Sequence, residues 1–402
     1  MYKSIYLIGA FDRHNYGDIL FPMIHTKILI QNGVNSDAIK YAAVSAADMR
    51  RIGGYETISI KQLLSQPLKS DTLLVLCGGD ILSADWLLML GNLSNPWVNK
   101  AFRIGRKIFG INTTNALAKI VLGQINSYPY IIGKPDTQAA IIYTAVGGAG
   151  FNGNEQHIKN VVDLLKTCNS VSVRDNDVRN LLGNAGLTPR LIPDTALPMS
   201  RIYPLDYLGK SNWKTKVDFC GNFSFEKYYS FQGAKRLLSD DISTIVNQIK
   251  RVYDATGFFP LFVPIGRAAD HEDHVPLERI FNALKADGYH AALLTSEHVL
   301  DIMAALAFAK CYIGTSLHGA ITTYSFGKKV IAVKANAVPK LKDFLNTWVN
   351  TKDFYLSATC EFEHPLIDII TSNTTFFSAA QLEQQIDQVT REIISQEISL
   401  HH

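Results

Sequence analysis

Short apolar segments alternate along most of the chain with segments whose apolar residues recur every three or four positions. The first kind is typical of buried strands and the second of helices. The stretch from Lys310 to Lys334 shows this unit clearly, because it predicts a strand at 311–314, a buried helix at 320–326 and a strand at 329–333. Gly327 follows the helix, where a residue that adopts positive φ is favoured. Strands that alternate with helices predict parallel sheets with right-handed crossovers.

The same pattern predicts two groups of elements. Before residue 200, it predicts strands at 4–10, 71–77, 138–146 and 170–173, and helices at 18–31, 155–167 and 175–182. After residue 216, it predicts strands at 217–220, 259–263 and 290–294, and helices at 240–255, 277–286, 298–308 and 378–398. Periodicity fades between residues 199 and 216, which is typical of a domain boundary.

We therefore predict an α/β protein of two Rossmann-like, doubly wound domains that face each other across a cleft. The expected division is a first domain at 1–200, a linker at 201–216, a second domain at 217–375 and a C-terminal helix at 376–400.

Composition narrows the class of protein. A chain of 402 residues can bury two full cores, and 47% apolar with 19% charged residues is typical of globular proteins. A net charge of +3 with scattered lysines and arginines argues against nucleic-acid binding. Five widely spaced cysteines favour a reducing compartment. The sequence shows neither a signal peptide nor an apolar stretch of about 20 residues, so we expect a cytoplasmic protein that does not span a membrane.

Polar and glycine-rich loops follow several predicted strands at their carboxyl ends, where ligands bind in open α/β sheets. These loops are Asn15–Asp18, Gly78–Asp80, Gly147–Gly150, the segment that begins with Arg174, and Thr315–Gly319. The last of them opens a helix, whose N-terminal N–H groups attract anions.

Each of these residues also has a purely structural interpretation. Asp18, Thr315 or Ser316 could cap a helix, and His318 could be an ordinary half-buried histidine. Arg174 could fork onto a carboxylate or phosphate of a ligand, or could pair only with Asp175, Asp177 or Asp194. The tract Asp270–His274 has residues that bind metals, but we predict no metal, since such surface tracts are usually solvated and structural sites draw ligands from two elements.

Taken in order, five short motifs resemble those of the polysaccharide pyruvyl transferase family. They are Asn15-Tyr16-Gly17-Asp18, Gly78-Gly79-Asp80-Ile81-Leu82, Ser172-Val173-Arg174-Asp175, Pro193-Asp194 and Gly314-Thr315-Ser316-Leu317-His318-Gly319. The family is similar in architecture to GT-B glycosyltransferases, with the first domain on the acceptor side and the second on the donor side. The chain departs from the family at Ser316, where many members have arginine, and in the glycine-rich turn that contains Gly148.

The resemblance implies transfer of a pyruvyl group from phosphoenolpyruvate to a pair of sugar hydroxyls, as a ketal, in surface or exopolysaccharide biosynthesis. It implies no cofactor beyond phosphoenolpyruvate as donor substrate. The donor's phosphate and carboxylate require cations and helix N-termini. Protonation of the methylene carbon requires a general acid with a pKa near neutrality, which suits histidine.

By this resemblance, His318 is expected to act as general acid or phosphate ligand, Arg174 to bind the donor, and Asp18 to serve the acceptor hydroxyl. The expected substrate-binding residues are Asn15, Gly17, Gly78, Gly79, Asp80, Gly148, Asp194, Thr315, Ser316 and Gly319. With serine at position 316, a second cation must come from elsewhere, and Lys334 and Arg267 are candidates.

The expected acceptor is a sugar or lipid-linked oligosaccharide, which would bring the enzyme close to a membrane; a homo-oligomer is compatible with the sequence. Irregular loops at 35–56, 223–239 and 268–276 are candidates for acceptor binding. Aromatic side chains in the second loop could stack on sugars or pack beneath the loop: Phe223, Phe225, Tyr228, Tyr229 and Phe231.

Two rival functions share this architecture. A nucleotide-sugar glycosyltransferase would normally supply a carboxylate for the ribose near the helix that Ser316 opens, and only Glu297 lies nearby in sequence. A catalytically silent sugar-binding protein is the other rival, and the missing arginine favours it slightly.

Overall fold

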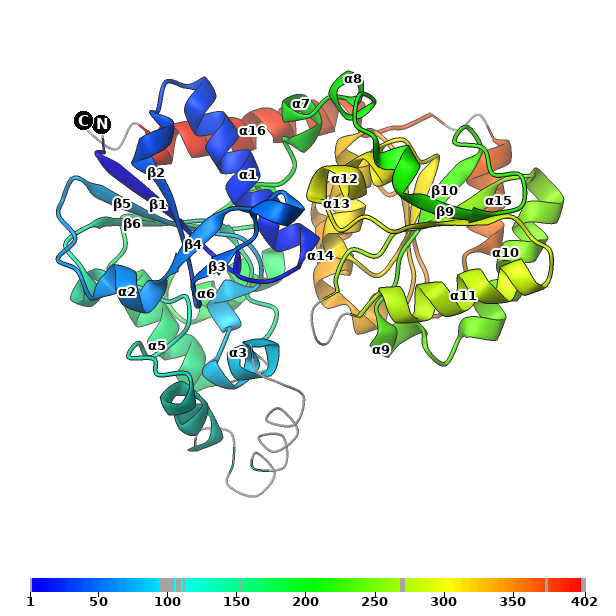
Figure 1. Ribbon diagram of the computed structural model, residues 1–402. Coiled ribbons are helices and arrows are strands. Elements are labelled where there is room, and N and C mark those ends of the chain that lie inside the picture. Colours follow the sequence, from blue (N-terminus) through cyan, green and yellow to red (C-terminus); the bar gives the residue numbers. More distant parts are fainter. Residues whose placement is uncertain are drawn as a thin grey trace.

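The structure is a computed structural model that describes residues 2–93, 105, 110, 113–151, 154–267, 272–372 and 375–398 (Figure 1). Within these residues, the chain forms two sheets dominated by parallel strands, each accompanied by helices.

The first sheet has eight strands in the order β3-β4-β2-β1-β5-β6-β7-β8. Its strands are β1 (Ser4–Ile8), β2 (Ile39–Ala43), β3 (Ala47–Asp48), β4 (Glu56–Ser59), β5 (Thr72–Cys77), β6 (Ala140–Val146), β7 (Ser170–Val173) and β8 (Arg190–Leu191). Only the short edge strand β3 pairs antiparallel among these strands. The main helices around it are α1 (Tyr16–Gln31), α2 (Ile60–Leu64), α3 (Trp86–Leu93), α5 (Glu155–Leu165) and α6 (Asn176–Asn184).

The second sheet has seven strands in the order β15-β14-β13-β10-β11-β12-β9. Its strands are β9 (Val217–Cys220), β10 (Tyr228–Phe231), β11 (Phe259–Phe262), β12 (Ala291–Leu294), β13 (Cys311–Gly314), β14 (Lys329–Ala332) and β15 (Phe354–Leu356). The helices of this part are α9 (Lys235–Leu238), α10 (Ile242–Thr256), α11 (His274–Ala286), α12 (Val299–Ala307), α13 (Leu317–Ser325), α14 (Pro339–Trp348) and α15 (Glu363–Thr371). Between the sheets lie α7 (Met199–Ile202) and α8 (Leu205–Leu208).

Three apolar clusters hold these layers together. One covers the outer face of the first sheet with α3, α5 and α6, and another covers the outer face of the second sheet with α10, α11 and α15. The third joins the facing sides of both sheets through α1, α12 and α13. Every residue of β5 and β6 is buried, which explains why these strands are continuous apolar runs in the sequence.

Three predictions about strands were wrong. The segment 223–239 was expected to be a loop, but Tyr228–Phe231 forms β10, a fully buried strand near the middle of the second sheet. Its side chains alternate between two apolar clusters, and Phe223 and Phe225 pack against Trp213 and Tyr228. Tyr228, Tyr229 and Phe231 are therefore core, and the half-buried Phe223 and Phe225 pack against it, which matches the packing alternative.

The other two errors concern the direction of β9 and the segment 35–56. β9 was expected to be parallel, but it pairs antiparallel with β12 at the sheet edge. The segment 35–56 was expected to be irregular, but it contains β2 and β3. The predicted loop 268–276 lies partly outside the described residues, and its described part begins α11.

The C-terminal helix α16 (Ala379–Glu397) returns to the first sheet and packs along α1 (Figure 1). At this contact, Nδ1 of His25 lies 2.8 Å from Oε1 of Glu397, and both side chains are fully buried. In the described part of the chain, none of the helices has the length and apolar character needed to cross a membrane.

Candidate active site

Four of the sequence motifs converge on one network of charged side chains. Arg174 follows β7 and donates from Nη1 to Asp194 and from Nη2 to Asp80, each at 2.9 Å. Nε2 of His318, in the first turn of α13, lies 3.8 Å from Oδ2 of Asp194. On the other side, Nζ of Lys340 donates to Oδ2 of Asp80 at 3.2 Å. The network therefore joins residues of both sheets.

Arg174 is the buried centre of this network, with 3% of its side chain exposed. Burial alone would lower the pKa of its guanidinium, but the carboxylates of Asp80 and Asp194 raise it overall. The observed contacts match the ion-pairing alternative for Arg174, with Asp80 as a partner that the sequence did not suggest. Its expected contact with a ligand stays a prediction.

The two carboxylates of the network are held in the ionised form. Burial tends to raise the pKa of Asp80, but Lys340 and Arg174 lower it to about 2. Burial also tends to raise the pKa of Asp194, but His318 and Arg174 lower it overall. Oδ1 of Asp194 also accepts from the N–H of Ala196 at 2.9 Å, which fixes the carboxylate in place.

His318 is positioned by close contacts with α1. A methyl group on Gly17 would lie 1.9 Å from Nδ1 of His318, so only glycine permits this approach. The ring of Phe21 contacts the imidazole edge to face, with centroids 5.2 Å apart. Ser316 caps α13 by accepting from the N–H of Gly319 at 3.3 Å, as one of the two expected caps.

The prediction that Asp18 caps α1 was wrong. Asn15 is the cap, because its Oδ1 accepts from the N–H of Gly17 at 3.1 Å. Asp18 lies inside the first turn, where a negative charge is favoured by the helix dipole. A Cβ on Gly79 would lie 3.0 Å from Oδ1 of Asp18, so the loop after β5 lies against the first turn of α1.

A buried amide fixes the turn that precedes His318. Oε1 of Gln232 accepts from the N–H groups of Thr315 at 3.1 Å and Ser316 at 2.9 Å, and from the hydroxyl of Tyr312 at 2.8 Å. Its Nε2 donates to Asp273 at 2.8 Å. The hydroxyl of Thr315 is not a cap, since it accepts from the N–H of Ala234. Gln232 thus links the end of β10 to the turn after β13.

Sequence reasoning missed Gln232 and Lys340, although both left a signal. Gln232 is a polar residue directly after an apolar run, at the carboxyl end of a strand. Lys340 follows Pro339 in the first turn of α14, where the helix dipole disfavours a cation. Such an unfavourable cation indicates an anionic partner, which is Asp80.

The two cations proposed to replace the missing arginine lie outside the network. Nζ of Lys334 pairs with Asp241 at 2.9 Å. Nε of Arg267 lies 3.7 Å from Oε1 of Glu297. The Arg267 side chain lines a separate cavity of about 260 Å³, together with His14, Asp48, Met49, Arg51 and Ile52. Lys340, through its ion pair with Asp80, is the cation that joins Arg174 and His318 in the network.

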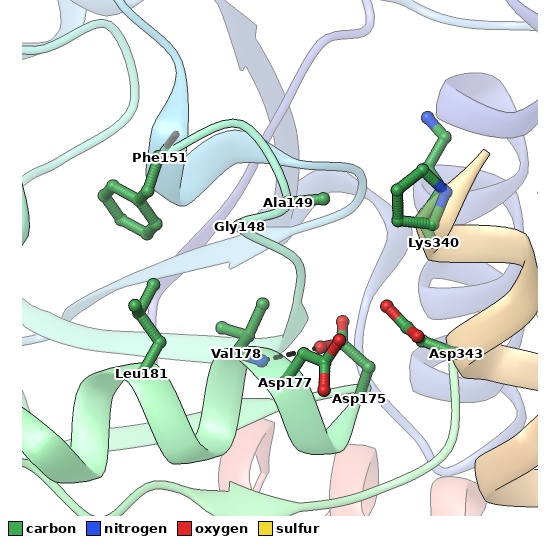
Figure 2. Close-up of a pocket in the computed structure, with 10 residues that line it drawn as sticks. Gly148, Ala149, Phe151, Asp175, Asp177, Val178, Leu181, Lys340 and Asp343 are labelled. Atoms are coloured by element: carbon green, nitrogen blue, oxygen red, sulfur yellow. Dashed lines mark hydrogen bonds between the residues drawn. The ribbon is translucent and has the colours of Figure 1, made fainter. Parts of the chain in front are cut away.

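The glycine-rich turns that follow β5 and β6 pack closely against the charged network. A Cβ on Gly147 would lie 2.5 Å from Oδ1 of Asp80 and 2.8 Å from Nη2 of Arg174, so this glycine permits their ion pair. Gly147 belongs to an expected ligand loop but was not among the expected substrate-binding residues. Gly78 has a φ of +115° and packs against Phe21. Gly319 lies against the ring of Tyr312. Gly148 lines a cavity of about 220 Å³ between α6 and α14 (Figure 2).

The described residues contain no group of three side chains suited to hold a metal ion. In the tract predicted to be solvated, Asp270 and His271 lie outside the described residues. Asp273 precedes α11, and its Oδ2 accepts from the N–H groups of Ile265 and Gly266 as well as from Gln232. This carboxylate therefore has a structural role.

Comparison with known proteins identifies the family and the fold. The model of the family described as "Polysaccharide pyruvyl transferase" matches residues 15–335. A search of the curated proteins found no match.

Several solved structures share the fold. The UDP-N-acetylglucosamine 2-epimerase from Rickettsia bellii has a TM-score of 0.54 at 10% identity, and the match covers 100% of this chain and 97% of the epimerase. The UDP-GlcNAc 2-epimerase from Methanocaldococcus jannaschii has a TM-score of 0.51 at 11% identity, covering 97% and 99%. The UDP-GlcNAc 2-epimerase from Neisseria meningitidis, bound to UDP-GlcNAc, has a TM-score of 0.51 at 10% identity, and the match covers 98% of this chain and 99% of the epimerase. At these identities the similarity concerns the fold alone, and it confirms the predicted GT-B-like architecture.

Proposed function

Because the chain belongs to the polysaccharide pyruvyl transferase family, we propose that it transfers a pyruvyl group from phosphoenolpyruvate to two hydroxyls of a sugar, as a ketal, in surface or exopolysaccharide biosynthesis. One observation supports this proposal above the others. Asp80, Arg174, Asp194 and His318 come from four separate motifs and lie in one charged network, which Lys340 extends. Networks of this kind hold anionic substrates and exchange protons with them.

The donor's phosphate and carboxylate require positive charge. Lys340 and His318 are assigned this role, since their side chains are 40% and 12% exposed. The N-terminus of α13 adds the partial positive charge of its N–H groups. Because Arg174 already forms two ion pairs, we propose that it positions Asp80 and Asp194. Its positive charge also attracts the anionic donor.

The proposed reaction protonates the methylene carbon of phosphoenolpyruvate, forms two C–O bonds from the central carbon to the sugar, and breaks the C–O bond to phosphate. His318 donates the proton to the methylene carbon. One sugar hydroxyl proton restores the proton of His318, and the other leaves with the phosphate. Asp194 orients the imidazole ring, and Asp18 orients an acceptor hydroxyl.

Glu297 bears on the rival glycosyltransferase function. Its carboxylate lies 3.0 Å from Nη2 of Arg51 and 3.7 Å from Nε of Arg267. A carboxylate held by two arginines is a poor partner for ribose hydroxyls, because binding would have to displace an ion pair. We therefore prefer phosphoenolpyruvate over a nucleotide sugar as donor.

The proposal is tested by measuring phosphate release from phosphoenolpyruvate in the presence of a pool of nitrophenyl glycosides and lipid-linked sugars. We expect acceptor-dependent release that falls about a hundredfold in His318→Ala, the usual effect of losing a general acid. His364→Ala is the matched control, since His364 is exposed on α15 and should leave the rate unchanged. Failure of phosphoenolpyruvate to stabilise the protein against heat, with stabilisation by a nucleotide sugar instead, would contradict the proposal.

A further inference from the structure

The cavity between α6 and α14 has no role in the donor chemistry described above. It measures about 220 Å³ and lies where the first half of the chain meets the second. Figure 2 shows Asp343 facing Asp175 and Asp177 across it, with Phe151 and Leu181 towards its other end. Val178, Gly148, Ala149, Pro339 and Lys340 complete the lining.

The cavity lies directly beside the charged network. Lys340 belongs to both, because it lines the cavity and donates to Asp80. At two other places, one residue belongs to the network and the next residue along the chain lines the cavity. Arg174 lies in the network and Asp175 in the cavity wall, and Gly147 lies under Asp80 while Gly148 lines the cavity. A ligand in this cavity would therefore be held next to the proposed donor site.

The lining combines an apolar wall with hydrogen-bond acceptors. Phe151, Val178 and Leu181 present carbon to one part of the cavity, and three carboxyl groups face the other. Sugars match such a site, since their C–H faces pack on apolar side chains and their hydroxyls donate to carboxylates. The volume is below the 300–1,000 Å³ that is typical of sites for larger ligands, so it suits about one sugar ring.

A carboxylate oxygen of a buried residue also points to a ligand. Asp175 is 6% exposed, and its Oδ1 accepts from the N–H of Val178 at 2.8 Å as the cap of α6. Its second oxygen accepts no hydrogen bond from the described part of the chain. Burial raises the pKa of this carboxyl. A hydroxyl donor in the cavity would satisfy the second oxygen.

We propose that this cavity is the acceptor subsite, which holds the sugar ring that receives the pyruvyl group, with Asp177 and Asp343 binding its hydroxyls and Asp343 accepting the hydroxyl proton. The inference rests on the proposed pyruvyl transfer. Asp343 and Lys340 are one turn apart on the same face of α14, so the proton acceptor lies beside the cation of the donor site.

The proton balance of the reaction agrees with this role. As each hydroxyl oxygen bonds to the central carbon, it loses its proton, and one of the two protons must leave with phosphate. Asp343 accepts that proton and passes it to the departing phosphate. Burial and the neighbouring Asp177 raise the pKa of Asp343 to about 7, and Asp175 acts in the same direction while Lys342 opposes it. A carboxyl with this pKa can accept a proton and release it near neutral pH.

The first experiment measures sugar binding without turnover. Saturation-transfer NMR with the methyl pyranosides of glucose, galactose, mannose and N-acetylglucosamine should detect contact of at least one ring with the wild-type protein. Ala149→Phe, which fills the cavity from an exposed loop, should abolish the signal, and Asp343→Asn should weaken it at least about tenfold. Asp163→Asn, on the exposed side of α5, is the control and should not change it. No signal from any of the four, or a signal that survives Ala149→Phe, would overturn the inference.

The second experiment separates this inference from the proposed function. Stabilisation by phosphoenolpyruvate against heat should be the same in wild type and Asp343→Asn, because the substitution alters only the acceptor side. If phosphoenolpyruvate fails to bind either protein while sugar contact depends on the cavity, the donor assignment fails and the sugar site stands. With both substrates bound, kcat should rise with pH as Asp343 ionises around pH 7 in wild type. A rise of the same size in Asp343→Asn would exclude Asp343 as the proton acceptor.

Discussion

At the scale of single residues, Gly17 determines where the imidazole of His318 can lie. Alanine is a better helix former than glycine by about 1 kcal/mol, so substitution in the first turn of α1 would normally stabilise the helix. Here a Cβ would overlap Nδ1 of His318 at 1.9 Å, which is far inside contact distance.

We therefore expect Gly17→Ala to fold but to displace the imidazole, lowering acceptor-dependent phosphate release at least about tenfold. Gly183→Ala on α6 is the matched control, since a Cβ there meets no atom within 4 Å. Equal rates for Gly17→Ala and wild type would show that the position of His318 is unimportant for turnover.

The sequence predicts such residues unevenly. His318, Arg174 and Asp194 were identified because they lie in motifs at the carboxyl ends of strands. Lys340 is not in a motif, and its role depends on the ion pair with Asp80, which is 260 positions away in the sequence. A pattern along the chain cannot contain a contact of that range, whereas the unfavourable place of Lys340 at a helix N-terminus is a local signal.

At the scale of elements, β10 and its following residue Gln232 determine the turn that opens α13. Replacing Gln232 with leucine would leave the buried N–H group of Thr315 without its acceptor, and the N–H of Ser316 would keep only the hydroxyl of Tyr312, 3.0 Å away. Each unsatisfied buried donor costs roughly 1–3 kcal/mol.

We expect Gln232→Leu to lower the free energy of unfolding by about 2 kcal/mol, measured by urea denaturation, and to reduce phosphate release as the turn loosens. Gln62→Leu, on the exposed surface of α2, should change neither quantity measurably. A stable and fully active Gln232→Leu protein would show that the capping of α13 by Ser316 suffices without this amide.

Element prediction failed where tertiary contacts outweighed the local pattern. Tyr228–Phe231 has no alternation of polar and apolar residues because both of its faces are buried, so it resembled an aromatic loop. β9 was expected to follow the parallel pattern, but an edge strand has one neighbour and can pair in either direction, and it pairs antiparallel with β12. Central strands such as β5 and β6 were found because their apolar runs are long and glycine follows each of them.

At the scale of the whole molecule, the two sheets share an apolar cluster through α1, α12 and α13. Polar contacts cross between the halves at the same place, where the hydroxyl of Tyr16 lies 2.8 Å from Oγ1 of Thr322 and Asn15 forms an isolated bridge with Gly266. We infer that the halves stabilise each other and unfold together. The helix α16 adds to this coupling, since it follows the second sheet in sequence and packs on α1.

The buried pair of His25 and Glu397 tests this coupling, because it fixes α16 to α1 at a place that water does not reach. Glu397→Leu would leave Nδ1 of His25 without its partner, at a cost of roughly 1–3 kcal/mol. We expect this loss in the free energy of unfolding, measured by urea denaturation in a single transition, while the double variant with His25→Leu recovers part of it. Asp387→Asn is the control, because its ion pair with Arg201 joins α16 to α7 on the surface and should matter far less. Two separate transitions in Glu397→Leu would mean that α16 holds the halves together, whereas two transitions in wild type would refute the cooperative unfolding inferred from the shared core.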